Sequence, residues 1–195
     1  MAEIKREYYS SGELRSEVFL LNGKKNGEYK SYRENGQLFE IVSFIDDEEN
    51  GEYKSYWDNG QLYNICMYID GKRIGEYKEY YEDGQLCVNC SYIDDQKNGE
   101  YKSYYDNGQL CWICSYIDGK RIGEYKSYHE NGQLCVNCSY IDDKRNGECK
   151  SYWDNGSLYV IYNCIDDMIN GESKRYDMNG ELVESCVYDN GIKID

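Results

Sequence analysis

The sequence has no proline, one alanine, one histidine and no apolar run near the ~20 residues of a membrane-spanning helix. Basic residues are also scarce, since 22 Lys and Arg accompany 37 Asp and Glu, for a net charge of −15. Nucleic-acid binders neutralise phosphates with clustered Lys and Arg, and anionic membrane leaflets attract the same residues. The shortage of basic residues therefore argues against a nucleic-acid partner and against a membrane partner.

The N-terminal segment, residues 1–17, has no apolar core of the kind found in signal peptides. We therefore expect a cytoplasmic protein. Its ten cysteines are expected to remain thiols and to pack as small hydrophobic side chains.

The abundant residues indicate an all-β fold, because 24 tyrosines favour strands and 19 regularly spaced glycines mark turns. The sequence repeats every 24 residues without insertion or deletion. We number each repeat from the glycine of its Gly-Glu pair, so that Gly27 is position 1 of the second repeat. Eight repeats fill a single predicted domain over residues 3–194: 3–26, 27–50, 51–74, 75–98, 99–122, 123–146, 147–170 and 171–194.

A coarser period of 48 residues is superimposed on the first. Residues 75–98 match 123–146 at 19 of 24 positions but match their neighbour 99–122 at only 15. The loops alternate in the same way between IDGKRI and IDDQKN or IDDKRN. We interpret this period as the result of duplicating a pair of repeats, without functional meaning.

Asn-Gly at positions 9 and 10 predicts a β-hairpin in each repeat, with a type I′ turn in which both residues take positive φ. Cross-strand partners then have positions that sum to 19, so that position 3 faces position 16. The predicted Tyr–Cys pairs are Tyr53 with Cys66, Tyr77 with Cys90, Tyr101 with Cys114, and Tyr125 with Cys138. In the seventh repeat the two residues exchange places, as Cys149 and Tyr162. An exchange that conserves volume at one packed position supports this register.

The register divides the side chains between two faces of a sheet. A packed face is predicted to carry Tyr at position 3, Ser at 5, Leu at 12, Cys at 16 and an aromatic ring at 18. Glycine at position 1 is expected to leave room for that ring, at Gly51, Gly75, Gly99, Gly123 and Gly147. A polar face is predicted to carry Glu at position 2, Lys at 4 and Tyr at 6. The candidate surface for a partner consists of Tyr32, Tyr56, Tyr80, Tyr104, Tyr128 and Tyr152, with Trp57 and Trp153 at position 7.

Three features could indicate a metal site or a catalytic site, but each is explained more simply as a structural feature. The Cys-x2-Cys pairs that begin at Cys87, Cys111 and Cys135 resemble zinc ligands, but cysteines three apart in a strand are expected to point to opposite faces. The Asp pairs in the loops lack the converging oxygens of a calcium loop. His129 has no positioned partner for acid–base work, and no nucleophile or phosphate-loop motif is present. We therefore expect no enzyme activity, metal or cofactor.

The pattern GEYKSY-x-x-NGQL followed by YIDGK resembles the MORN repeat, in the variant form found in viral and bacterial proteins, and the resemblance covers nearly the whole chain. It implies an elongated, twisted antiparallel sheet of eight tandem hairpins. It also implies protein–protein contact and scaffolding, with homodimers in some members. We expect a viral scaffolding protein of the host cytoplasm or the virion that presents an acidic, Tyr-rich surface. The alternatives are an antitoxin or immunity partner of a basic protein, and a lipid-surface binding module.

Overall fold

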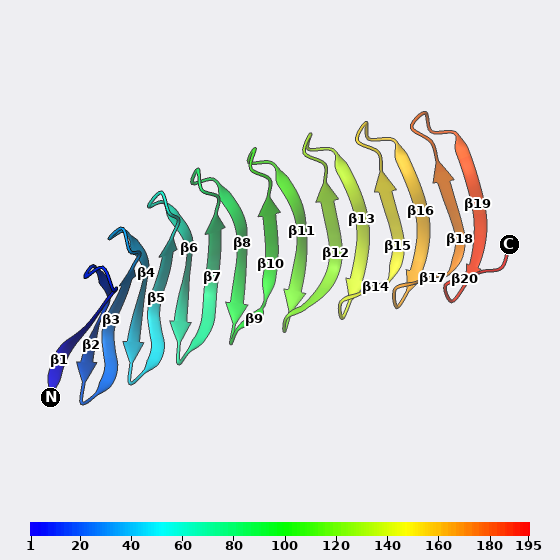
Figure 1. Ribbon diagram of the computed structural model, residues 1–195. Helices are drawn as coiled ribbons and strands as arrows, with labels where there is room; N and C mark the ends of the chain where they lie inside the picture. The colour runs from blue at the N-terminus through cyan, green and yellow to red at the C-terminus, as the bar shows by residue number, and fades with distance from the viewer. The chain divides into compact units, whose positions relative to one another are not determined.

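The computed structural model describes residues 1–195, which divide into two compact units, 1–96 and 97–195. Both consist of antiparallel strands joined by tight turns, and the predicted all-β fold of tandem hairpins is confirmed (Figure 1). The strands of the first unit are β1 (Ala2–Tyr8), β2 (Leu14–Leu21), β3 (Lys24–Tyr32), β4 (Leu38–Ile45), β5 (Glu48–Tyr56), β6 (Leu62–Ile69), β7 (Lys72–Tyr80) and β8 (Leu86–Ile93). The short β9 (Gln96–Lys97) lies at the boundary.

The second unit continues the same pattern with more interruptions. Its strands are β10 (Gly99–Tyr104), β11 (Leu110–Ile117), β12 (Lys120–Tyr128), β13 (Leu134–Ile141), β14 (Lys144–Arg145), β15 (Gly147–Tyr152), β16 (Leu158–Ile165), β17 (Met168–Ile169), β18 (Gly171–Tyr176), β19 (Leu182–Asp189) and β20 (Ile192–Lys193). Strand β13 pairs with both β14 and β15, and β16 pairs with both β17 and β18, because each of these short strands precedes a break at position 24.

The predicted register within each hairpin is confirmed for positions 1 to 5. Tyr53 pairs with Cys66, Tyr77 with Cys90, Tyr101 with Cys114, and Tyr125 with Cys138. The exchanged pair also has the predicted place, with Cys149 opposite Tyr162.

The turn at Asn-Gly differs from the predicted type I′ turn. Only the glycine takes positive φ, +80° at Gly108, while Asn107 does not. The amide of Gly108 donates to the carbonyl of Tyr105, and the amide of Tyr105 donates to the carbonyl of Gln109, so the loop has three residues. Tyr104 at position 6 therefore pairs with Leu110 at position 12, and these two positions sum to 18. Position 13 is an extra residue in its strand, and beyond it the paired positions sum to 19 again, as in Ser103 with Trp112. The prediction failed because the side-chain oxygen of Asn107 accepts the amide of Gln109 at 2.9 Å, which stabilises the asparagine at negative φ.

The type I′ geometry occurs at the other end of the strands. Positions 20 and 21 both take positive φ, as at Asp70 (+50°) with Gly71 (+72°) and Asp94 (+49°) with Asp95 (+65°). This turn joins each hairpin to the next, and Ile69 pairs with Lys72 across it. Aspartate accepts the left-handed conformation more readily than most residues, which explains why Asp-Asp can replace Asp-Gly here.

Glycine occupies position 1 for a different reason from the one predicted. A Cβ built on Gly75, Gly99, Gly123 or Gly147 would meet no atom within 4 Å, so room for the opposite ring is not required. These glycines instead take φ between +65° and +97°, where other residues are strained. The strand pairing shifts at this point, because the Gly-Glu pair bulges out between one hairpin and the next.

The core of each unit is a layer of rings and thiols on one side of its strands. Cysteines at position 16 are among its most buried members, with Cys66, Cys90 and Cys114 each no more than 3% exposed. Tyrosine at position 3 meets the ring at position 18 edge-on, with centroids 5.7 Å apart for Tyr77 and Tyr92. Burial raises the pKa of the Tyr53 hydroxyl and of the Tyr68 hydroxyl to about 12. The ring layer therefore substitutes for the second layer of secondary structure that most sheets need.

In the seventh repeat this layer is rearranged around three thiols. Cys138, Cys149 and Cys164 are 3%, 1% and 0% exposed, and Tyr162 packs against them. Burial, together with the neighbouring thiols of Cys164 and Cys138, raises the pKa of the Cys149 thiol to about 12. Cys149 therefore packs as a protonated thiol, and the ring of Tyr162 comes from position 16, on the strand opposite the one that carries tyrosine in the other repeats.

Candidate functional site

The side chains of positions 2, 4, 6, 12, 15 and 17 lie on the other side of the strands in each unit, which we call the open face. Leu110 belongs to it because it pairs with Tyr104, and directly paired residues project to the same side. The prediction that leucine at position 12 packs with the core was therefore wrong, and the extra residue at position 13 is the cause. The opposite side, with positions 3, 5, 7, 13, 14, 16 and 18, is called the ring face.

A shallow cavity lined by the same repeat positions recurs on the open face. Leu62, Ile65 and Met67 of one hairpin line it together with Glu76, Lys78 and Tyr80 of the next, around a volume of 250 Å³. The corresponding residues of β10 to β12 line a cavity of 300 Å³, and those of β15, β16 and β18 line one of 320 Å³. Isoleucine occupies position 15 in all three, as Ile65, Ile113 and Ile161. Asparagine replaces it in the intervening repeats, at Asn89 and Asn137.

The charges beside these cavities are compensated in pairs. Within each first strand, lysine at position 4 bonds to glutamate at position 2, as in Lys102–Glu100 and Lys126–Glu124. The same pair occurs in seven repeats, at 2.5 to 2.9 Å. Hydrogen bonding to these glutamates raises the pKa of Lys102 and of Lys126. The open face is therefore close to neutral along its middle, although the chain as a whole is strongly acidic.

The structure separates the predicted partner residues into two groups. The six tyrosines at position 6 lie half-buried on the open face, while Trp57 and Trp153 lie on the ring face. Trp57 packs on Tyr63 with centroids 4.4 Å apart, and Trp153 packs on Tyr159 at 4.5 Å. The tyrosines and the tryptophans therefore do not form one surface.

Position 7 instead bonds each hairpin to the next one. The indole Nε1–H of Trp57 donates to the carbonyl of Tyr80 at 2.9 Å, and His129 Nε2 lies 3.0 Å from the carbonyl of Tyr152. The same contact to position 6 of the next repeat is made by Tyr9, Arg33, Tyr105 and Trp153, at 2.7 to 3.3 Å. The sequence varies here, but each of these side chains can donate a hydrogen bond. His129 is thus part of the interface between hairpins.

The last repeat departs from this rule. Asp177 occupies position 7, and its carboxylate accepts the amides of Asn179 and Glu181 in its own turn, each at 2.9 Å. An ionised carboxylate has no proton to donate to a following hairpin. The residue that bonds forward in the other repeats therefore closes its own turn in the last one.

Asparagine at position 9 has a similar double role at the hairpin tips. While its oxygen accepts an amide of its own turn, the amide nitrogen of Asn131 donates to the carbonyl of Asp154 in the next repeat at 2.7 Å. Asn59, Asn107 and Asn155 make the same forward bond.

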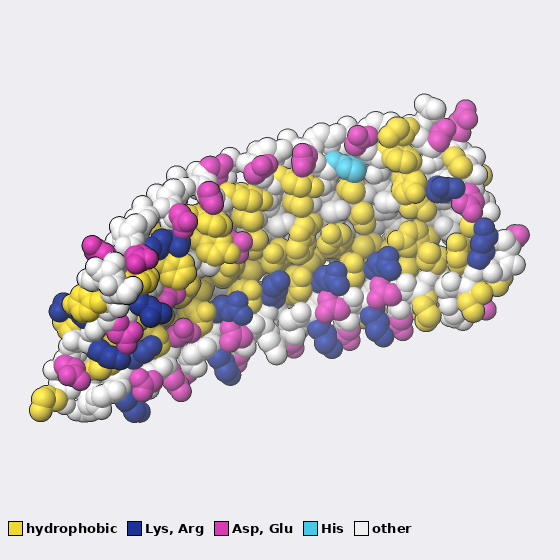
Figure 2. All heavy atoms as spheres, in the orientation of Figure 1, with side chains coloured by type: hydrophobic (Ala, Val, Ile, Leu, Met, Phe, Trp, Pro, Cys, Tyr) yellow, Lys and Arg dark blue, Asp and Glu magenta, His cyan; other side chains and the backbone are white.

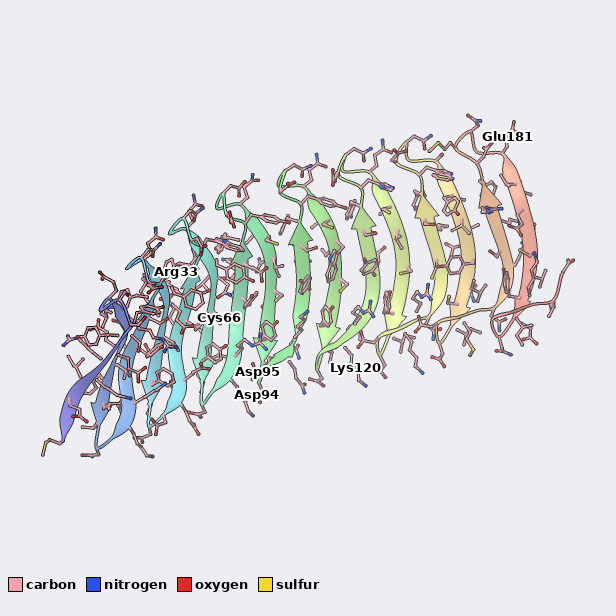
Figure 3. All side chains as sticks on the ribbon, viewed as in Figure 1. Arg33, Cys66, Asp94, Asp95, Lys120 and Glu181 are labelled. Atoms are coloured by element: carbon pink, nitrogen blue, oxygen red, sulfur yellow. The ribbon has the colours of Figure 1, made fainter.

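The connecting turns are held by ion pairs between successive repeats. Arg73 and Arg121, at position 23 of the IDGKRI loops, bond to Asp95 and Asp143 at position 21 of the following loops, at 2.7 and 2.8 Å. The same aspartates also accept the backbone amides of these arginines. Figure 3 labels Asp94 and Asp95 at this end of the strands and Arg33 at the hairpin tips. Arg145, in an IDDKRN loop, makes the same ion pair with Asp167 at 2.9 Å, so the contact depends on the residues at positions 23 and 21 and does not follow the 48-residue period.

These aspartates predict an acid-side loss of stability. Hydrogen bonding to Arg121 holds the pKa of Asp143 below its ordinary value, and Arg73 does the same for Asp95. A lowered folded-state pKa stabilises the fold above the unfolded value of about 3.9, and this contribution disappears as pH falls through the folded value. We expect urea midpoints to fall below about pH 4, and to fall less in Asp143→Asn and in Arg121→Ala. Equal acid slopes in the wild type and both variants would contradict the assignment.

The Cys-x2-Cys pairs do not point to opposite faces as predicted. At position 13 of the third repeat the ring of Tyr63 packs on Trp57 of the ring face with centroids 4.4 Å apart, so position 13, which Cys111 occupies in its repeat, lies on the same side as Cys114. The extra residue at position 13 turns Cys111 toward the ring face. The structure contains no group of three or more His, Cys, Asp or Glu side chains arranged to hold a metal ion. It also contains no helix with the length and apolar character to cross a membrane.

Together these features define a repeat protein made of β-hairpins, in which each hairpin contacts only its neighbours. A sequence model described as the MORN repeat variant matches residues 25–46, 49–70, 73–94, 97–118, 121–142 and 145–163. The chain belongs to this family. The first and last hairpins lie outside the matched segments, although Ser173 still pairs with Cys186 at positions 3 and 16 in the last one. No curated protein matches the sequence.

Solved structures offer only distant likenesses. A structure described as TcdB2-TccC3 matches 97% of this chain at 12% identity and a TM-score of 0.23, and one described as TcdB2-TccC3-Cdc42 matches 94% at 13% identity and 0.21. The chain spans 14% and 13% of the lengths of these two chains. A protein of unknown function from Bacteroides fragilis is 9% identical over 97% of this chain and 95% of its own, with a TM-score of 0.13.

Proposed function

We propose that this protein is a non-enzymatic interaction and scaffolding module whose open face binds other proteins. The observation that carries the proposal is the repetition of one cavity, lined by leucine, isoleucine and tyrosine, at equivalent places in both units. Tyrosine provides a large contact area at low entropic cost and is enriched in protein interfaces. The ring face is less available, because its rings and thiols form the core and its position-7 side chains bond to the next hairpin.

Exposed apolar side chains extend this surface toward the connecting turns. Isoleucine at position 19 follows positions 15 and 17 on the same side of the strand. Ile93, Ile117 and Ile141 are 58%, 51% and 60% exposed. Exposed apolar side chains that recur in a row, flanked by polar ones, are typical of protein-binding surfaces.

The proposal is tested with a variant that carries Tyr104→Ala, Tyr128→Ala and Tyr152→Ala. A matched control carries Cys87→Ala, Cys111→Ala and Cys135→Ala, three half-buried residues of the ring face. Circular dichroism and thermal melts select the variants that remain folded. We expect the proteins that co-purify with the wild type to be retained by the control and lost, by about tenfold or more, from the tyrosine variant, since buried tyrosines are among the residues that dominate interfaces. Equal recovery on both variants would contradict binding through the open face.

A further inference from the structure

A cavity of 320 Å³ lies on the ring face of the first hairpin, against the first strand of the second hairpin. Lys5, Ser16 and Leu20 line it from positions 3, 14 and 18, together with Tyr29 from position 3 of the second repeat. Lys5 pairs with Val18, so the first hairpin keeps the register of the others. Figure 2 shows the ring face, on which hydrophobic side chains gather across the strands. The cavity is thus part of the ring layer, although charged and polar side chains share its walls.

The cavity results from side chains that differ from those of the later repeats. Position 3 is tyrosine in the second to sixth repeats, and position 18 is phenylalanine or tyrosine in the same repeats. In the fifth repeat a third ring is added at position 14, where Trp112 stacks on Tyr101 with centroids 4.3 Å apart and lies 5.8 Å from Tyr125 of the next repeat. The first repeat has lysine, serine and leucine at these three positions, so it contributes no ring beside Tyr29.

Glu7 provides a hydrogen-bond acceptor in the wall of this cavity. It occupies position 5, and the ammonium of Lys5 lies 2.9 Å from its carboxylate. The fourth repeat also has glutamate at position 5, and there the hydroxyl of Tyr77 donates to Glu79 at 2.8 Å. An ionised carboxylate has about four acceptor positions, so the bond from Lys5 leaves capacity for another donor. A phenol in the cavity therefore finds in Glu7 the partner that Tyr77 finds in Glu79.

The charges around the cavity favour a neutral ligand. Lys25 and Asp47 also line it, and the carboxylate of Asp47 accepts the backbone amide of Lys25 at 2.7 Å. The two lysines and the two acidic residues of the wall cancel in formal charge. The ammonium of Lys25 already lies over the ring of Tyr29, 5.1 Å from its centroid, so this ring has a cation partner within the chain.

We propose that this cavity binds a phenol ring, which comes from a small molecule or from an exposed tyrosine of another protein. The ring packs beside Tyr29, as Trp112 packs beside Tyr125, and its hydroxyl donates to Glu7. A cavity of about 150 Å³ is large enough for benzene, so 320 Å³ accommodates a phenol. The site lies on the face opposite the proposed protein-binding surface, so it goes beyond the proposed function and does not depend on it.

The test is a titration of the full chain, with labelled valine and leucine methyl groups, followed by nuclear magnetic resonance. The probe is p-cresol, the side-chain analogue of tyrosine. Toluene lacks the hydroxyl, and 4-methylcyclohexanol lacks the aromatic ring. We expect saturable shifts at Val18 and Leu20, with p-cresol binding about tenfold more tightly than toluene and about fivefold more tightly than 4-methylcyclohexanol. Absence of saturable shifts at these methyl groups, or equal affinity for p-cresol and either control, would overturn the proposal.

Two variants place the ligand within the cavity. Lys5→Tyr introduces the tyrosine of the later repeats, and we expect its ring to compete for the space and to weaken p-cresol binding by about tenfold or more. The matched control Arg6→Tyr adds the same ring to the next residue, which points to the opposite face, and is expected to change the affinity by less than about twofold. Equal affinity of Lys5→Tyr and Arg6→Tyr for p-cresol would contradict the placement.

A variant of the acceptor and a second probe complete the test. Glu7→Ala is expected to reduce the preference for p-cresol over toluene from about tenfold to less than about twofold, and an unchanged preference would rule out the hydrogen bond. N-acetyltyrosine amide distinguishes the two sources of the ring. Affinity equal to that of p-cresol assigns the cavity to tyrosine side chains, binding of p-cresol alone assigns it to small phenols, and binding of neither overturns the proposal. The proposed function, which rests on the open face, stands in every case.

Discussion

Tyr162→Cys is expected to lower the free energy of unfolding by about 2–3 kcal/mol, because it removes a half-buried ring and leaves a void. The ring packs against Cys138, Cys149 and Cys164, which are too small to fill its place. Cys149→Tyr alone adds a second ring to the same space, and we expect a loss of about 1–3 kcal/mol from overpacking.

The double variant Cys149→Tyr, Tyr162→Cys restores the arrangement of the other repeats, in which tyrosine occupies position 3 and cysteine position 16. Its stability is expected to lie within about 1 kcal/mol of the wild type, as volume-conserving exchanges usually do. Urea unfolding of the four proteins gives the coupling energy directly. Additive losses in the double variant would show that the two residues do not share one packing space.

The second large effect concerns the bond that joins one hairpin to the next. Trp57→Ala is expected to cost about 2–4 kcal/mol, because it removes both the packing on Tyr63 and the hydrogen bond to the carbonyl of Tyr80. Trp57→Phe keeps most of the packing and is expected to cost about 1–2 kcal/mol for the unpaired carbonyl.

The matched control is Trp57→Tyr. Tyr105 already makes the same bond from position 7, with its hydroxyl 2.8 Å from the carbonyl of Tyr128. We therefore expect the tyrosine variant to lie within about 1 kcal/mol of the wild type, since it retains a donor and a ring. Chemical denaturation ranks the three variants, and a phenylalanine variant as stable as the tyrosine variant would rule out the hydrogen bond as the common function of position 7.

Much of the fold follows from the repeat. The 24-residue period locates every hairpin, and the exchanged pair Cys149 and Tyr162 indicates the register that the structure shows. The turns were harder to predict, because Asn-Gly fits two loop lengths and only the side-chain bond of the asparagine decides between them. The positive φ values at Asp94 and Asp95 were missed because Asp-Asp is a weaker turn signal than Asn-Gly.

The side chains of the candidate site were predicted less well than the fold, because one residue in each hairpin, at position 13, shifts the register. The extra residue at position 13 moves Leu110 to the face of Tyr104 and moves Cys111 to the ring face. A hydrophobic pattern alone does not reveal such a bulge. The bonds from position 7 to the next hairpin could have been predicted from the sequence. The residues at this position, Tyr, Arg, Trp and His, can all donate a hydrogen bond from the side chain.

The proposed partner contacts depend on which side chains lie on the open face, above all on whether Leu110 lies beside Tyr104. Nuclear Overhauser measurements on protein with labelled leucine methyl groups test it directly, with Tyr104→Phe and Tyr101→Phe to assign the signals. We predict contacts from the methyl groups of Leu110 to the ring of Tyr104, its cross-strand partner. Contacts from Leu110 to Tyr101 and Trp112 instead would place the leucine on the ring face and contradict the account.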